Sequence, residues 1–130
     1  MNAEQVRSFA LSLPGATEDL KPEWGESLLF RIGGKIFVSM GLAVVPPRLQ
    51  VKCTPERFAE LLEIDGVSVA GYVGRFQWVQ FSTSGVFRDA EIREIIRESY
   101  DNIIAKLPRK RRELLAQAGP VKTKGPSRRV

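Results

Sequence analysis

The stretch SLLFRIGGKIFVSM, residues 27–40, decides the fold because it contains the clearest strand–turn–strand pattern in the chain. Apolar runs flank the Gly33-Gly34 dipeptide on both sides, and glycines readily adopt the positive φ angles of a tight hairpin turn. A two-residue turn pairs Phe30 with Phe37, whereas a three-residue turn pairs Phe30 with Val38. The sequence leaves both registers open, and the choice determines which side chains share a face of the sheet.

A short helix is predicted before the hairpin. Asn2 can cap it, and Gln5 stands at the third helical position, where its side chain can return the bond. Apolar residues recur at helical spacing as far as Leu13, and Pro14-Gly15 ends the helix. Residues 16–26 are expected to form a polar loop that leads into the hairpin.

A third strand and a second helix are predicted after the hairpin. Apolar and polar side chains alternate through residues 48–53, which is typical of a half-buried strand. Thr54 and Pro55 are a capping residue and a favoured first helical residue, so a helix begins there. Residues 67–75 are rich in glycine and give no clear assignment, and residues 76–82 are predicted to form the last strand.

The C-terminal part is predicted to be helical and then disordered. Asp89 is expected to cap a long helix whose isoleucines form an apolar stripe. Pro108 interrupts this helix, and residues 109–118 are predicted to continue as a second, short one. Residues 119–130 lack apolar periodicity, which favours disorder. The expected organisation is one domain over residues 1–118 and a basic tail over 119–130.

Strands joined by short turns, with helices at both ends, predict an α+β fold in which helices pack on one face of an antiparallel sheet. The length of 130 residues fits one domain. The single cysteine excludes an internal disulfide, no apolar run is long enough to span a membrane, and the N-terminus lacks the pattern of a signal peptide. We therefore expect a cytoplasmic protein without membrane contact.

Positive charge is concentrated near the C-terminus. Residues 1–105 hold 11 Lys and Arg against 14 Asp and Glu, a net charge of −3, and residues 106–130 hold 9 against one, a net charge of +8, which together give +5. A basic tail can attract nucleic acid, anionic lipid or acidic proteins, and it can equally be a solvated segment that keeps the protein soluble.

The residue types on which most enzymes depend are scarce. The chain has no histidine, the commonest general base and metal ligand. Cys53 falls on the apolar side of its predicted strand, where a core cysteine is expected rather than a nucleophile. The carboxylates of residues 18–26 can hold a hard cation, but such groups more often belong to a solvated loop. No cofactor motif is present. We expect a protein that is not an enzyme, with no catalytic residue, no metal and no cofactor.

Basic side chains near a tryptophan suggest contacts with nucleic acid. Trp78 can stack on a base while nearby cations hold phosphate, although aromatic residues in strands usually fill the core. The basic run on the predicted last helix can face a phosphate backbone while its leucines pack on the body, or it can simply be solvated. The candidate nucleic-acid contacts are Arg31, Lys35, Lys52, Arg75, Trp78, Arg109, Lys110, Arg111 and Arg112.

The order and spacing of several short segments resemble the MmcQ/YjbR family over most of residues 3–104. The matching segments are LPG at 13–15, FRIGGKIF at 30–37, VKCTPE at 51–56, WV at 78–79 and ESY at 98–100.

The resemblance implies a fold similar to that of the bacterial frataxin CyaY, a two-layer sandwich of helices on an antiparallel sheet. It also implies DNA binding, which is commonly assigned to family members from shape and surface charge rather than from a defined site. Many members have a histidine immediately before the tryptophan, where this chain has Gln77. Glutamine keeps the hydrogen bonding but does not titrate, so a role that needs a proton is not expected here.

Two non-enzymatic functions follow from these observations. The first is a DNA-binding module that contacts phosphates with basic side chains, which fixes position without specifying sequence. It requires the basic residues of the body to gather on one face despite the body's negative net charge. The second is a module that binds a protein or a small ligand, and a pocket lined by Trp24, Tyr72 or Trp78 would favour it.

Overall fold

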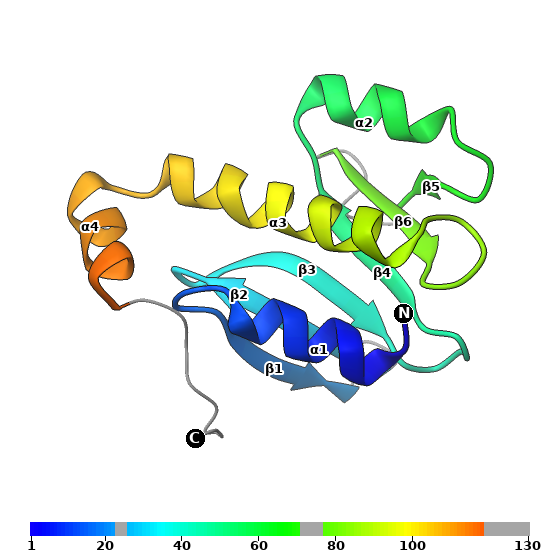
Figure 1. Ribbon diagram of the computed structural model, residues 1–130, viewed down its shortest axis with the longest axis horizontal. Coiled ribbons are helices and arrows are strands. Elements are labelled where there is room, and N and C mark those ends of the chain that lie inside the picture. The colour runs from blue at the N-terminus through cyan, green and yellow to red at the C-terminus, as the bar shows by residue number, and fades with distance from the viewer. Residues whose placement is uncertain (23–25, 71–76, 119–130) are drawn as a thin grey trace.

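A computed structural model describes residues 1–22, 26–70 and 77–118, and within these ranges it shows one antiparallel sheet of six strands covered by helices (Figure 1). The strands lie in the order β1-β2-β3-β4-β6-β5. Their bounds are β1 Thr17–Lys21, β2 Ser27–Ile32, β3 Lys35–Gly41, β4 Arg48–Lys52, β5 Ser68–Val69 and β6 Trp78–Ser82. The helices are α1 Ala3–Ser12, α2 Pro55–Leu62, α3 Asp89–Lys106 and α4 Arg109–Ala118. The predicted α+β fold with an antiparallel sheet is confirmed.

The β2–β3 hairpin combines the two registers that the sequence left open. Ile32 pairs with Lys35 across a two-residue turn, whose glycines have φ angles of 60° and 82°. Farther from the turn, Phe30 pairs with Val38, because a β-bulge shifts the register between Arg31 and Phe30. The turn is therefore the two-residue form, while the pairing of Phe30 is the one expected for the three-residue form.

Phe37 is the additional residue of this bulge, since no residue of β2 is its partner. In a bulge two residues of one strand oppose a single residue of the other, and both Phe37 and Val38 are fully buried in the core. The Phe37 carbonyl accepts a hydrogen bond of 2.5 Å from Ser99 Oγ on α3. The rings of Phe37 and Tyr100 pack in a T-shaped arrangement, with their centroids 5.4 Å apart. The bulge is thus the place where α3 is attached to the sheet.

The core lies between one face of the sheet and the helices. Val6 of α1, Leu61 of α2 and Ile96 of α3 all belong to one hydrophobic cluster with the inward side chains of β2, β3, β4 and β6. The predicted isoleucine stripe of α3 is confirmed. Figure 1 shows α1 and α3 lying on the same side of the sheet. Within the described ranges, no helix is both long and apolar enough to cross a membrane.

The opposite face of the sheet carries a row of hydrogen-bonded polar side chains. Ser39 donates to Gln50 at 3.0 Å, and Gln50 donates to Gln80 at 3.4 Å. Gln80 in turn donates to Ser68 at 3.2 Å. The row crosses β3, β4, β6 and β5, so side chains as well as the backbone hold these strands in register.

The local helix signals are mostly confirmed. Asn2 and Gln5 form the predicted reciprocal capping box, with bonds of 2.8 and 2.9 Å. Thr54 Oγ1 accepts from the Arg57 backbone N–H at 3.2 Å, so it caps α2 as predicted. Pro108 separates α3 from α4, also as predicted.

Two expectations are wrong. Thr17–Lys21 forms an edge strand paired with β2, not a loop. Its side chains are mostly polar on both faces, so the strand has no apolar alternation and depends on the partner strand. Asp89 is the first residue of α3 rather than its cap. The capping position is Arg88, whose backbone N–H donates to the Glu91 carboxylate at 2.9 Å.

Replacing Ser99 with alanine should destabilise the protein, because it removes the buried donor to the bulge carbonyl. We expect the free energy of unfolding to fall by about 1–3 kcal/mol, measured by urea denaturation. Ser12→Ala is the matched control, since Ser12 Oγ makes a 2.6 Å bond to the Phe9 carbonyl at an exposed site. The control should change stability by less than about 0.5 kcal/mol, and equal losses in the two variants would contradict the role of the bulge.

Candidate anion-binding site

A cleft of about 790 Å³ opens where the β2–β3 hairpin, the end of β4, the start of β6 and the C-terminal half of α3 meet. Its lining includes one carboxylate, from Glu56, and four cationic side chains, from Arg31, Lys35, Lys52 and Lys106. An excess of one sign of charge in a concave site produces a potential that attracts the opposite sign. The cleft is therefore suited to anions.

The four cations meet because each stands near the end of its element. Arg31 and Lys35 lie beside the hairpin turn, on β2 and β3. Lys52 and Lys106 are the last residues of β4 and α3. Three of the four were predicted as candidate contacts, and the structure brings these three together. Lys106 was not predicted, because only the packing of α3 places it beside the hairpin.

Lys52 shows that the lysines of the cleft crowd one another. Partial burial lowers the pKa of Lys52, and the charges of Lys106 and Lys35 lower it further. No acidic side chain of the described residues forms an ion pair with any of these three lysines. Like charges disfavour one another's charged forms, so a bound anion would relieve this repulsion.

Arg31 is held in place by two contacts. Its guanidinium donates to the Gly34 carbonyl at 3.3 Å and lies 3.8 Å from the Asp19 carboxylate. A surface ion pair of this length contributes little energy. A guanidinium has five N–H donors, so Arg31 keeps several of them for a ligand.

Trp78 forms part of the cleft wall and not a platform for stacking. It lines the cleft, but the residue is only 8% exposed. It lies opposite Lys52 in the β4–β6 register. The preceding residue, Gln77, also lines the cleft and has a φ of 62°, which few residues other than glycine adopt. The structure favours the interpretation of Trp78 as a core side chain.

The other predicted residues lie outside the cleft or outside the described ranges. Arg75, Trp24 and Tyr72 belong to the segments that the structure does not describe. The basic run 109–112 is exposed on α4 and does not line the cleft. Of the two interpretations that the sequence left open for this helix, Leu114 fits the solvated one, because it is 59% exposed.

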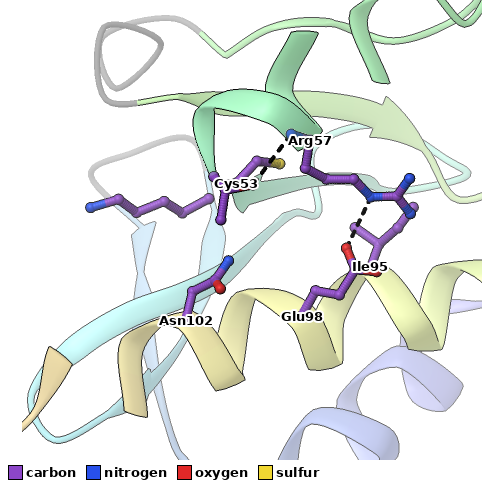
Figure 2. Close-up of a pocket in the computed structure, with 7 residues that line it drawn as sticks. Cys53, Arg57, Ile95, Glu98 and Asn102 are labelled. Atoms are coloured by element: carbon purple, nitrogen blue, oxygen red, sulfur yellow. Dashed lines mark hydrogen bonds and ion pairs between the residues drawn. The ribbon is translucent and has the colours of Figure 1, made fainter. Parts of the chain in front are cut away.

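A smaller cavity, of about 260 Å³, adjoins the cleft (Figure 2). Arg57 of α2 reaches across it, and its Nε donates to the Glu98 carboxylate of α3 at 3.0 Å. Ile95 and Asn102, on the same side of α3, also line it, together with Lys52, Cys53 and Thr54. The cavity therefore lies between α2 and α3, beside the end of β4.

The model of the protein family YjbR matches residues 11–102. This chain belongs to the YjbR family. It is 23% identical over 119 residues to the uncharacterized protein YjbR of Escherichia coli K12. The alignment covers 90% of this chain and 99% of that protein.

Two solved structures are similar to this YjbR-family chain. A crystal structure of a Deinococcus radiodurans protein with a DUF419 domain has a TM-score of 0.80, 24% sequence identity and coverage of 88% of each chain. A crystal structure of a Pseudomonas syringae protein has a TM-score of 0.66 and 17% identity, with coverage of 78% of this chain and 98% of that one. At these identities the likeness shows the fold alone.

Cys53 is a core residue of this YjbR-family protein, as predicted. It is 7% exposed, and burial raises the pKa of its thiol to about 11. The reactive thiolate is therefore scarce at neutral pH. Among residues 1–22, 26–70 and 77–118, no group of three potential metal ligands lies together. Glu18, one of the carboxylates considered for a cation, is instead paired with Arg7 at 2.6 Å.

The small cavity was not predicted from the sequence. Glu98 and Asn102 are four residues apart on α3, which places them on one side of that helix. This spacing was the available signal, together with the position of Glu98 in the ESY segment. Nothing in the local sequence shows that α2 brings Arg57 to the same place, because that contact depends on tertiary packing.

Removing one neighbouring charge should bring the pKa of Lys52 closer to that of an ordinary lysine. We expect Lys106→Gln to raise the pKa of Lys52, because it removes a like charge that disfavours the protonated form. The measurement is an NMR pH titration of the lysine side chains. Lys110→Gln removes the same charge from α4, outside the cleft, and should leave the pKa of Lys52 unchanged. An equal rise in both variants would show that overall charge, not local crowding, is responsible.

Proposed function

We propose that this protein binds nucleic acid through the phosphates of the strand, with the basic cleft as its principal contact. The observation that carries the proposal is the gathering of Arg31, Lys35, Lys52 and Lys106 in one cleft, although residues 1–105 have a net charge of −3. Three of these four cations belong to residues 1–105, and their position in one cleft supports the hypothesis that basic side chains of the body share a face. Lysines without acidic partners gain the most favourable interaction energy when phosphates bind beside them.

The junction of α3 and α4 adds a second basic segment to this surface. Leu107, which follows Lys106, is only 6% exposed. It lies over the hairpin turn, since a Cβ added to Gly33 would be 2.9 Å from Leu107 Cδ2. This contact fixes the end of α3 at the hairpin, and the exposed run Arg109–Arg112 begins two residues later. A strand bound in the cleft can therefore also pass close to α4.

A small anionic ligand is the second candidate. A concave site of about 790 Å³ has the size of a ligand pocket. Trp78 and Gln77 give it an apolar and a polar wall beside the cations. Phosphate or carboxylate groups of such a ligand would use the same lysines.

We also propose that the role is binding and not catalysis, and that the protein acts in the cytoplasm, where nucleic acid is available. Two features support the first point: Cys53 is buried with a raised pKa, and the chain has no histidine to serve as a general base.

Neutralising the cleft should weaken DNA binding and reduce its salt dependence. We would measure fluorescence anisotropy of labelled DNA with the full-length protein over a salt series. In Lys35→Gln/Lys106→Gln, two phosphate contacts are lost, so the slope of log K against log salt should become less steep by about 1.4 for a single strand and 1.8 for a duplex.

Two variants with the same change in net charge complete this test. Arg48→Gln/Arg93→Gln lies away from the cleft, at the first residue of β4 and in the first half of α3, and should change the slope little. Arg111→Gln/Arg112→Gln reports the share of α4. Equal effects of the cleft variant and the Arg48/Arg93 variant would show that only nonspecific attraction is present, and absence of binding at low salt would refute the proposal.

A further inference from the structure

We propose that the small cavity between α2 and α3 holds the base of an unpaired nucleotide whose phosphate is bound by the cations of the cleft. This inference rests on the proposed function and names the ligand unit: a nucleotide with a free base, within a single strand or as a free molecule. It assigns Arg57, Glu98 and Asn102 to the base and the lysines to the phosphate.

The two cavities adjoin one another, which one ligand needs if it is to reach both. Lys52, Cys53, Thr54 and Asn102 line the cleft and the small cavity alike. Of the four cleft cations, Lys52 alone also lines the small cavity, so it lies where the two cavities adjoin. A nucleotide has the matching layout, with a compact charged group joined to a flat polar one.

Charge is divided between the two compartments in a way that fits this layout. The cleft carries four cations against Glu56. In the small cavity the charge of Arg57 is already balanced, because it is paired with Glu98 at 3.0 Å and with Glu60. The carboxylate of Glu98 would repel a phosphate there. An uncharged polar group is the better occupant, and a nucleobase is such a group.

The lining of the small cavity offers the contacts that unpaired bases receive in proteins. Single-stranded bases stack on arginine guanidinium planes and form hydrogen bonds along their exposed edges. The guanidinium of Arg57 is held by carboxylates from two helices, so its plane is fixed before a ligand arrives. Asn102 supplies an amide donor and acceptor, and Ile95, only 2% exposed, supplies apolar surface.

A base within a duplex cannot enter this cavity, because its edge is paired and its faces are stacked on neighbours. Extracting it costs a few kcal/mol. The inference therefore predicts a preference for single strands over duplexes. Phosphate contacts alone do not predict that preference, since the double helix has the higher charge density.

The test compares two single strands that carry the same number of phosphates. One is a short oligonucleotide, and the other is an abasic strand of the same length. With full-length protein at fixed salt, we expect the base-bearing strand to bind about tenfold more tightly, in line with the contribution of one stacked base. Arg57 lines the small cavity but not the cleft, and Arg57→Lys keeps the positive charge while it removes the guanidinium plane. This variant should remove most of the difference and leave binding of the abasic strand unchanged.

The cleft variant Lys35→Gln/Lys106→Gln provides the opposite control. It should weaken both strands by the same factor, so that the ratio between them persists. If Arg57→Lys fails to fold, as judged by circular dichroism, the comparison of the two strands with the natural chain still decides the question. A nucleoside monophosphate is the further probe, and competition by it at the concentration of the oligonucleotide would identify a free nucleotide as the ligand.

Equal affinity for the abasic and base-bearing strands would overturn the base site and leave the phosphate-binding function intact. A duplex that binds more tightly than the single strand would also overturn it. If no strand binds at low salt, the proposed function itself fails, and this inference fails with it.

Discussion

The attachment of α3 to the β2–β3 hairpin is the contact on which the rest of the structure depends. Ser99 donates to the carbonyl of the bulge residue Phe37. At the C-terminal end of the same helix, Leu107 lies over Gly33. Gly33 has a φ of 60° and no side chain, so the turn can form and the leucine can approach it. These two contacts place the end of α3 beside the hairpin tip and so bring Lys106 to the cleft.

The cleft illustrates why the net charge of a domain says little about its binding surface. The first 105 residues are acidic overall, but several of their acids are paired with arginines away from the cleft, as Glu18 is with Arg7. The lysines at the ends of β3, β4 and α3 lack such partners among the described residues. Crowding them is unfavourable by itself, and the burial of the α3 isoleucines against the sheet offsets that cost. An anion bound in the cleft, as we propose, would relieve the repulsion between these lysines.

Much of the fold was predictable because its signals are local. The capping box at Asn2, the two-glycine turn and the break at Pro108 each depend on a few neighbouring residues. The bulge at Phe37 and the strand Thr17–Lys21 were not predictable, because both depend on pairing with β2. The candidate site divides in the same way. Basic residues beside predicted turns and strand ends identified three of the four cleft cations. The place of Lys106 in the cleft and the cavity around Arg57 depend on the packing of α2 and α3, which the local sequence does not show.

We propose that the cleft at the hairpin end of the sheet binds the phosphates of a nucleic-acid strand. A titration of ¹⁵N-labelled full-length protein with a short oligonucleotide, followed through the backbone amide shifts, tests this binding at the level of single residues. We expect the largest shifts at Arg31, Lys35, Lys52 and Lys106. Shifts confined to residues 119–130, or to the polar row on the opposite face of the sheet, would contradict it.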